Sequence, residues 1–207
     1  GVAADGGLWE FGDAPAALAL MQEIRAGTKT GRLLGNGAAA IGEALGVERI
    51  PVVKGQAFSA YDPRAIKGTG VTYATSPQGA DHTAGLTIRA NVDHHNPDEQ
   101  KLASQRMQIL AAAWDTLGVC LFGSFGFANA PGAVRDLLRG RYGWDVEDNI
   151  VEQLGCMTIE LEREYNRRAG FGPEDDRLPN WVKSQPLPPI DEVFDVSDQD
   201  LDSVFDW

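Results

Sequence analysis

The chain of 207 residues is long enough for one sizeable hydrophobic core or two small ones, and its 43% hydrophobic and 23% charged residues are typical of a globular protein. The net charge of −12, with no basic stripe, argues against a nucleic-acid surface. No apolar run reaches the roughly 18 residues of a membrane-spanning helix. Two cysteines do not make a secreted disulfide framework, which favours a cytoplasmic location.

Two helices are predicted at the N-terminal end. Asp13 is a suitable N-cap, Pro15 suits a first turn, and Gly27 ends the first helix. The positions of this helix that are expected to face a core are Leu18, Met21 and Ile24. The second helix is expected to end at Gly46. Its apolar positions are Leu34, Ala38, Ile41 and Leu45.

The stretch between Gly46 and Asn96 changes character. It is crowded with Gly, Pro, Ser and Thr and shows no sustained helical period, apart from a short extended piece expected near residues 49–53. A second such stretch covers residues 170–189. Long irregular stretches inside a compact protein are usually functional.

Two more helices are predicted in the second half. Asn96 is a good N-cap for a helix that ends near Gly118. Its apolar positions are Ala103, Met107, Leu110, Ala111 and Trp114. A last helix is expected from Asp145 to Gly170. Its inward positions are Ile150, Leu154, Met157 and Leu161. The fold class expected from these patterns is mainly α.

The C-terminal segment, residues 191–207, holds seven acidic residues and no Lys or Arg, so the rest of the chain carries a net charge of only −5. Two interpretations are open. The segment is either a solvated acidic tail or, because apolar residues recur along it, a segment that packs against the helical body.

The cysteine in WDTLGVC (114–120) is the first candidate for chemistry. Gly118 allows a sharp reversal that would bring the Asp115 carboxylate and the Cys120 thiol into one region. Cys120 could complete a metal site, or it could be a small buried apolar residue. For Cys156, which lies on an apolar helix, the buried-thiol interpretation is preferred.

The histidines are the second set of candidates. His82 lies in a loop with few bulky groups, and the adjacent Asp81 suits it for proton transfer near neutral pH, although a solvent-facing histidine has the same signature. The pair His94 and His95 precedes a helix start and is interpreted as a solvated cap region. YDPR (61–64) is interpreted as a turn with a salt-bridging arginine.

Three motifs, in order, resemble one family. They are KGQAFSAYDPRAIKGTGVTYATSPQGADH (54–82), WDTLGVC (114–120) and LEREYNRRAGFGPEDDRLPNW (161–181). Together they resemble the C-terminal part of the tungsten-containing aldehyde ferredoxin oxidoreductase family. The resemblance runs from about Trp9 to Trp181, and it implies the multihelical C-terminal domains of that family with long Gly/Pro-rich loops.

The resemblance also implies cofactors and roles. The family holds tungsten, or molybdenum in some relatives, between two pterin dithiolenes, beside a [4Fe-4S] cluster. Cys120 matches the fourth cluster ligand, and Asp115 matches an aspartate that hydrogen-bonds a pterin. The backbone of Gly118 and Val119 would lie against the same pterin. His82 matches the histidine near the metal that assists proton transfer.

The domain assignment implied by the resemblance divides the chain into three parts. Residues 1–50 correspond to the end of helical domain 2, residues 51–190 to helical domain 3 with its cofactor-facing loops, and residues 191–207 to the acidic tail. The chain lacks the C-x-x-C-x-x-x-C motif that supplies the other cluster ligands, and Ala84 stands where many members place a basic pterin contact. The isolated chain is therefore expected to hold neither cofactor and to be inactive.

The resemblance implies an enzyme that oxidises aldehydes to carboxylic acids and passes electrons through the cluster to ferredoxin. Its expected partners are ferredoxin, the N-terminal domain of the same protein and a second subunit in a homodimer, with no nucleic acid and no membrane. Two alternatives remain: a relative with another substrate, such as an aromatic ring, and a stand-alone helical interaction module that uses its acidic tail.

Overall fold

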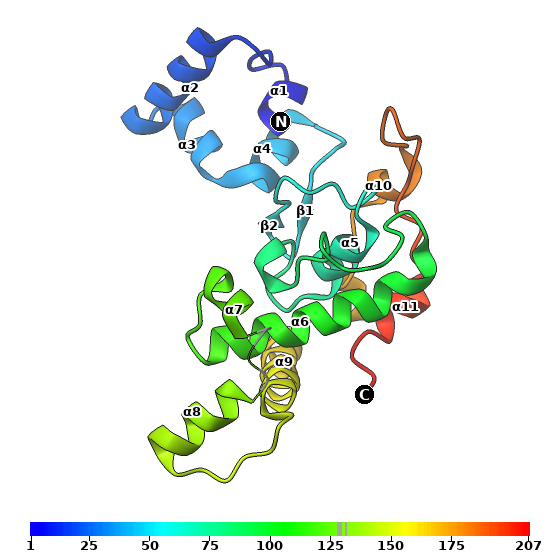
Figure 1. Ribbon diagram of the computed structural model, residues 1–207. Helices are drawn as coiled ribbons and strands as arrows, with labels where there is room; N and C mark the ends of the chain where they lie inside the picture. Colours follow the sequence, from blue (N-terminus) through cyan, green and yellow to red (C-terminus); the bar gives the residue numbers. More distant parts are fainter. Residues whose placement is uncertain (128–129, 131) are drawn as a thin grey trace.

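Helices dominate the computed structural model, which describes residues 1–127, 130 and 132–207 (Figure 1). In the N-terminal half they are α1 (Val2–Asp5), α2 (Ala14–Ala26), α3 (Lys29–Gly35), α4 (Gly37–Leu45), α5 (Lys67–Thr75) and the 3₁₀ turns η1 (His82–Ala84) and η2 (Pro97–Glu99). Then follow α6 (Gln100–Thr116), α7 (Leu121–Phe127), α8 (Ala133–Tyr142), α9 (Ile150–Ala169), η3 (Pro173–Asp175), α10 (Asn180–Ser184) and α11 (Asp198–Asp202). The mainly α expectation is confirmed.

Helix α5 lies at the centre of the core, and all nine of its residues are buried. Its two apolar side chains of the middle turn, Val71 and Tyr73, pack in a cluster with residues of the C-terminal segment. Its threonines return their hydroxyl protons to the backbone: Thr75 donates to the carbonyl of Val71 at 2.8 Å, and Thr72 donates to that of Gly85 at 2.7 Å. Because it is buried on every side, α5 has no polar face and no apolar stripe, which explains why periodicity did not predict it.

The helix α6 packs on α5 through a polar contact. Ser104 Oγ lies 2.7 Å from Thr72 Oγ1, and Gln108 Nε2 donates to Thr75 Oγ1 at 3.0 Å. Both Ser104 and Gln108 are buried, as is Gln100 near the start of the helix. The predicted apolar face of α6 is therefore only part of its buried surface, and Leu110 is in fact exposed. The polar side chains of α6 provide hydrogen-bond partners for the buried threonines of α5.

A two-stranded antiparallel hairpin, β1 (Val52–Val53) and β2 (Gln56–Ala57), precedes α5. Its two-residue turn, Lys54 and Gly55, has positive φ at both positions, 49° and 80°, as in the tight turns that match strand twist. The short extended piece expected near residues 49–53 is confirmed, with its partner strand immediately after it.

The C-terminal segment docks onto the body, so the second of the two interpretations of the acidic tail is correct. Four of its side chains are at most 3% exposed and belong to the core cluster around α5: Phe194, Val196, Leu201 and Val204. Its acids also have a partner. The buried ammonium of Lys67 lies 3.0 Å from Glu192 and 2.7 Å from Asp195. Burial acts to lower the pKa of Lys67, but hydrogen bonds to these two carboxylates outweigh it and raise that pKa.

Helices α6 and α9 cross in direct backbone contact. A Cβ atom on Gly155 of α9 would lie 2.1 Å from the carbonyl oxygen of Ile109 on α6, so only glycine permits this approach. In Figure 1, α6 runs across the middle of the molecule and α9 extends from it toward α8.

Several N-terminal expectations were wrong in part. Asp13 caps α2 by accepting from the Ala16 amide, and Gly27 ends it in the left-handed conformation, as predicted. However, the positions expected to face a core are exposed by 46–62%: Leu18, Met21 and Ile24. Helix α3 contacts α2 but leaves these three side chains largely exposed. The second predicted helix is two helices, α3 and α4, because the chain breaks at Asn36 and Gly37, where φ is +88°.

The second half also departs from expectation. Helices α7 and α8 were not predicted, and α9 begins at Ile150 with Asn149 as its N-cap rather than at Asp145. Two of the positions predicted to face inward, Met157 and Leu161, are 49% and 65% exposed. The buried side of α9 is instead the one that carries Gly155 and Ile159, which face α6.

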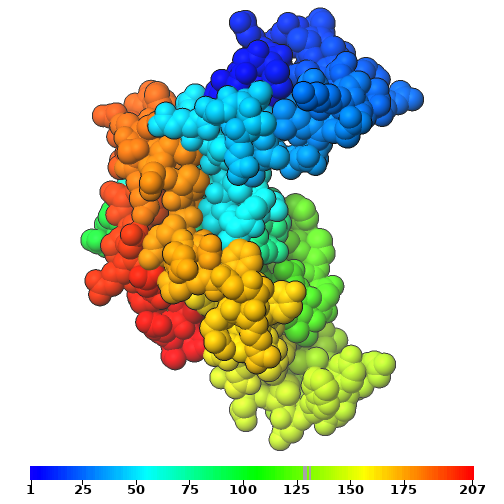
Figure 2. Space-filling view, turned by 180° about the vertical axis from the view of Figure 1, so that it is seen from behind, coloured from blue at the N-terminus to red at the C-terminus, as the bar shows by residue number. Residues whose placement is uncertain are grey.

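The molecule is elongated, with α1–α4 at one end and α8 at the other (Figures 1 and 2). Both ends project to the same side, which leaves that side concave in Figure 2. Within the described ranges, no single helix is both long and apolar enough to cross a bilayer. The length and hydropathy are reached only by joining residues 97–116 with α7, two arms that are bent by 104°.

Candidate cofactor site

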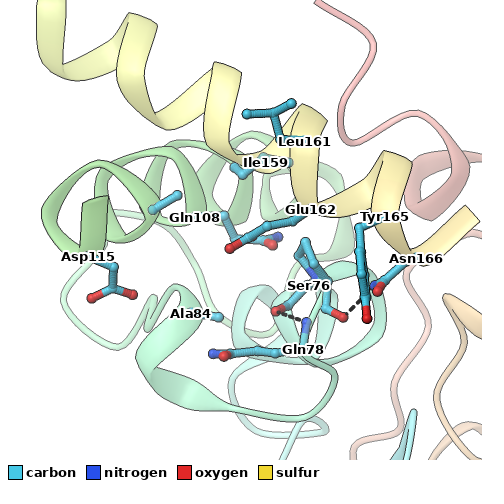
Figure 3. A pocket seen from close by; sticks show the side chains of 12 residues that line it. Ser76, Gln78, Ala84, Gln108, Asp115, Ile159, Leu161, Glu162, Tyr165 and Asn166 are labelled. Atoms are coloured by element: carbon cyan, nitrogen blue, oxygen red, sulfur yellow. Dashed lines mark hydrogen bonds between the residues drawn. The ribbon is translucent and has the colours of Figure 1, made fainter. Parts of the chain in front are cut away.

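A cavity of about 390 Å³ opens between α6, α9 and the loop that follows α5 (Figure 3). Its lining comes from all three of the sequence motifs. The lining residues are Ser76, Pro77, Gln78, Ala84, Gln108, Ala112, Asp115, Ile159, Leu161, Glu162, Tyr165 and Asn166. In Figure 3 the side chains of Glu162 and Gln108 point into the cavity from the helices, while Gln78 and Ala84 face them from the loop.

The loop at 76–84 is fixed by contacts at both ends. Asn166 of α9 donates its amide to the carbonyl of Pro77 at 2.7 Å. Gly79 has a φ of +85°, and a Cβ there would lie 2.3 Å from the Val53 carbonyl oxygen of the hairpin. Asp81 then caps η1 by accepting from the Thr83 amide at 2.9 Å. The contacts of Pro77, Gly79 and Asp81 therefore determine the path of the 76–84 loop, which forms one wall of the cavity.

The C-terminal end of α5, at the back of this loop, is held by buried charge. The Lys54 ammonium donates to the carbonyls of Ala74 at 2.6 Å and Ser76 at 3.2 Å, and it pairs with Asp176 at 2.6 Å. Arg163 of α9 reaches the other oxygen of Asp176 at 3.1 Å. Burial lowers the pKa of Lys54, and Asp176 opposes that shift. Cations suit the negative end of a helix, so this network caps α5 and ties it to α9.

Two carboxylates line the cavity without a cation beside them. Partial burial raises the pKa of Asp115, and the nearby charge of Asp81 raises it further. Burial also raises the pKa of Glu162, with a further contribution from Asp115. The cavity is therefore a place of negative potential where protonation or an N–H donor is favoured. Sequence reasoning identified Asp115 but missed Glu162, whose only signal was its place on the side of α9 that carries Leu161 and Asn166.

His82 lies beside the cavity on η1, and its side chain is one-third exposed. Its Nδ1 is 2.8 Å from Ser59 Oγ and 3.4 Å from Asp81 Oδ1, and its ring lies 5.3 Å from that of Tyr61. Nδ1 is thus engaged, which leaves Nε2 as the nitrogen for a further partner. Nearby, burial raises the pKa of Tyr73 to about 12, so its hydroxyl stays protonated.

Cys120 lies at the far end of the segment that begins with Asp115. The chain leaves α6 at Thr116 and reverses at Gly118, where φ is +68°. Cys120 is exposed and immediately precedes α7. The thiol is therefore not sealed in the core, and the buried-thiol alternative for Cys120 was wrong. Cys156 is partly buried, and burial raises the pKa of its thiol, with the acids Glu152 and Glu160 adding to the shift.

The remaining predicted features are plain structural ones. Arg64 and Asp62 of YDPR pair at 2.8 Å, and the guanidinium lies over the ring of Trp181, which confirms the salt-bridging turn. His95 is exposed, as expected before a helix start, whereas Nδ1 of His94 is buried. Across the described residues, no group of three or more His, Cys, Asp or Glu side chains is arranged to hold a metal ion.

The comparison with known proteins decides the family. Residues 2–206 match the family described as "Aldehyde ferredoxin oxidoreductase, domains 2 & 3". The chain belongs to the aldehyde ferredoxin oxidoreductase family.

The curated relatives of this family that the chain resembles are archaeal. It is 32% identical to the tungsten-containing aldehyde ferredoxin oxidoreductases of Pyrococcus furiosus over 168 residues and Pyrococcus abyssi over 152 residues. The enzyme of that name from Thermococcus kodakarensis is 32% identical over 145 residues. These alignments cover 76%, 69% and 66% of this chain, respectively. They cover only 27%, 25% and 24% of the relatives, so the chain spans about a quarter of their length.

The geometry brings all three of the motif segments that resemble the aldehyde ferredoxin oxidoreductase family together at one cavity. Asp115 and Ala84 share its lining, and His82 lies on the same 3₁₀ turn as Ala84. Gly118, Val119 and Cys120 follow Asp115 without a break. The roles of these residues toward a cofactor stay predictions.

Proposed function

We propose that this chain forms the C-terminal part of an oxidoreductase that converts aldehydes to carboxylic acids. In this proposal the reaction takes place at a tungsten, or molybdenum, bis-pterin centre, and a [4Fe-4S] cluster passes the electrons to ferredoxin. The observation that carries the proposal is the cavity in which Asp115 meets the η1 loop, from which the chain leads through Gly118 to the exposed Cys120. The similarity to the tungsten-containing aldehyde ferredoxin oxidoreductases of Pyrococcus furiosus and Pyrococcus abyssi supports the reaction class.

The residues of the cavity suit one pterin ring. An acceptor-rich lining of about 390 Å³ complements a planar heterocycle that carries N–H donors. The Asp115 carboxylate would accept from the ring, and the backbone at Gly118 and Val119 would lie against it. When bound, the metal centre supplies an acceptor for two electrons, and the cluster supplies a path for passing them singly.

Cys120 is exposed enough to be a cluster ligand, but the remaining ligands of the cluster would have to come from other residues. An exposed thiol after a glycine reversal is accessible to an iron atom. Since the described residues hold no set of three ligands, the other cysteines would come from polypeptide outside this sequence. The isolated chain is therefore expected to be inactive and free of cofactors, because binding needs ligands from both parts.

His82 is proposed to move the proton. Ser59 and Asp81 engage Nδ1, so the ring orientation is fixed and Nε2 is left to bond a substrate oxygen or take its proton. Tyr61 packs against the ring and limits its rotation. The proposal also includes a cytoplasmic location and a homodimer.

The helical-module alternative loses its main support. That alternative needs a free acidic arm, whereas Glu192 and Asp195 are paired with the buried Lys67, and Phe194 lies in the core. A relative that acts on another substrate stays open as the second form of this proposal, because the lining residues do not define a substrate.

The test is substitution of Cys120 in the whole enzyme that contains this chain. Cys120→Ser is expected to lower cluster iron per polypeptide and change the electron paramagnetic resonance spectrum of the reduced cluster, because a weaker ligand replaces a thiolate. Cys156→Ser is the matched control and should leave both unchanged. A Cys120→Ser enzyme with full iron and an unchanged spectrum would contradict the proposal.

A further inference from the structure

The chemistry of His82 depends on which of its two ring nitrogens carries the proton when the ring is neutral. A neutral imidazole donates from one nitrogen and accepts at the other, and the groups around the ring decide between the two forms. Two groups face Nδ1: the hydroxyl of Ser59, with Oγ at 2.8 Å, and the carboxylate of Asp81, with Oδ1 at 3.4 Å.

The carboxylate of Asp81 is held in one orientation by its own loop. Oδ1 accepts from the Thr83 amide at 2.9 Å. Oδ2 accepts from the Thr83 hydroxyl at 2.7 Å and from Gln78 Nε2 at 3.2 Å. A carboxylate has no proton to give, so a lone pair on Nδ1 would face a lone pair on Oδ1, whereas an N–H group would face a negative charge. Asp81 therefore favours a proton on Nδ1.

Ser59 supplies the shorter contact, and the core holds this residue in place. Its backbone carbonyl accepts from the Tyr61 amide at 2.7 Å and from the hydroxyl of the fully buried Tyr73 at 3.4 Å. The adjacent Phe58 ring stacks on that of Tyr73, with centroids 5.1 Å apart. Among the residues that the structure describes, the Ser59 hydroxyl bonds only His82, and Ser59 is partly exposed, so water can take its proton. Ser59 Oγ is thus free to accept from Nδ1–H.

The other groups near the ring do not reverse this preference. The Tyr61 ring packs against that of His82, and the Tyr73 hydroxyl, which stays protonated, donates to the Ser59 carbonyl and not to the imidazole. The nearest further charge is another carboxylate, that of Asp115, whose pKa responds to the charge of Asp81. In the described part of the chain, the only ion-pair contact of Asp81 is with His82, so no lysine or arginine offsets its charge.

We propose that Ser59 is a positioning residue that, together with Asp81, holds neutral His82 with its proton on Nδ1, so that Nε2 presents a lone pair. In this form Nε2 accepts a proton and cannot donate a hydrogen bond. The opposite form, with the proton on Nε2, would donate to a substrate oxygen and could not act as a base. The proposal thus decides between the two roles that are open to this histidine.

The consequence for the reaction rests on the proposed function. When water adds to an aldehyde, an O–H bond of the water breaks and its proton adds to Nε2. The electron pair of that bond forms the new bond from oxygen to the aldehyde carbon, and the carbonyl electron pair moves onto the carbonyl oxygen. The imidazolium that results keeps its Nδ1–H on Ser59 beside the charge of Asp81, which stabilises it.

The experiment measures the tautomer of His82 in the 207-residue chain by NMR, with isotopically labelled ring nitrogens and at an alkaline pH where imidazole is neutral. Protonated and unprotonated ring nitrogens resonate far apart, so the proton is located directly. The signals are assigned with a His82→Gln variant, and His94 and His95 serve as internal references. The Nδ1–H form of His82 is expected to exceed the Nε2–H form by at least about 10-fold, because two acceptors face Nδ1.

Ser59→Ala is the decisive variant, since it removes the closer acceptor and keeps the backbone. It should lower the ratio of the two forms by about 2–10-fold, the factor that one net hydrogen bond supplies. Ser59→Thr keeps a hydroxyl and should restore the ratio. Ser184→Ala is the matched control: the Ser184 hydroxyl bonds the Asn180 carbonyl of its own helix at 3.0 Å, and its loss should leave His82 unchanged.

A parent chain in which the Nδ1–H form of His82 does not predominate would overturn the inference. So would a Ser59→Ala chain with the same ratio as the parent, or a Ser59→Thr chain with the ratio of Ser59→Ala. None of these results bears on the iron content of the Cys120→Ser enzyme, so failure of the inference and failure of the proposed function are distinguishable.

Discussion

At the scale of single residues, buried charge holds this fold at the end of α5. Lys54 is only 5% exposed at its side chain and bonds two helix-terminal carbonyls as well as Asp176, which is itself 10% exposed. One lysine therefore acts as the cap that a glycine or a water would otherwise provide. The hairpin, the central helix and the segment after α9 all meet at this ammonium.

Lys54→Met should destabilise the chain by about 3–5 kcal/mol, because Asp176 would stay buried with only Arg163 as its partner and two carbonyls would lose their donor. Urea unfolding followed by circular dichroism measures the change. Lys183→Met is the control: Lys183 pairs with Asp198 at the surface, and its loss should cost less than about 1 kcal/mol. Equal effects of the two substitutions would contradict the capping role.

The same scale shows what sequence could predict of the site. The sequence identifies Asp115, His82 and Cys120 as candidates because reactive side chains are uncommon in the segments that surround them. It does not identify Gln108, which also lines the cavity, because the buried amide of Gln108 is held by a network of hydrogen bonds among five other residues that are spread along the sequence. No spacing rule carries that information.

At the scale of elements, α5 is built around close approach. Its two glycines face neighbours rather than solvent. A Cβ on Gly68 would lie 2.8 Å from Thr87 Oγ1, and a Cβ on Gly70 would lie 2.5 Å from the ring of Phe194. The two glycines lower the intrinsic helix propensity of α5, but they allow its neighbours to pack closely on all sides.

Gly70→Ala should destabilise the chain by about 1–3 kcal/mol, although alanine is the better helix former, because the methyl group would displace Phe194. Thermal unfolding with calorimetry measures this loss. Gly140→Ala in α8 is the matched control, since a Cβ there meets no neighbouring atom, and it should stabilise by about 0.5–1 kcal/mol. Stabilisation by both substitutions would show that helix propensity, and not packing, governs α5.

The elements that sequence predicted well are those with strong boundary signals. The cap at Asp13 and the terminal glycines Gly46 and Gly170 are where they were expected. Asn96 also acts as an N-cap, but of the 3₁₀ turn η2 that leads into α6 rather than of α6 itself. Helix α5 was missed because burial on every side erases periodicity. The inward face predicted for α2 was wrong for a different reason, since its pattern is amphipathic but its apolar side chains remain 46–62% exposed.

At the scale of the whole molecule, the two ends of the sequence behave differently. The C-terminal segment completes the core around α5 and neutralises Lys67, while the N-terminal helices project from one end with apolar side chains exposed. The acidic composition of residues 191–207 therefore says little about disorder. Its apolar residues are the ones that determine its place.

Phe194→Ala should destabilise the chain by about 3–5 kcal/mol, since it empties a site that is 1% exposed at the centre of the core. Native-state hydrogen exchange should show the loss in α5, which Phe194 contacts, as well as in the C-terminal segment. Phe11→Ala, at a position that is 74% exposed, should change stability by less than about 0.5 kcal/mol. Exchange that rises in residues 191–207 alone would mean that the segment is an independent appendage.

The contact between Gly155 and the Ile109 carbonyl has a consequence for the cavity. It fixes how far apart α6 and α9 stand, and Asp115 and Glu162 project from those two helices. Because Gly155 has no side chain, the two helices can approach closely. A larger side chain at this position would push α6 and α9 apart and widen the cavity between them, without changing any residue of its lining. Gly155 therefore influences the width of the cavity although it is not one of the residues that line it.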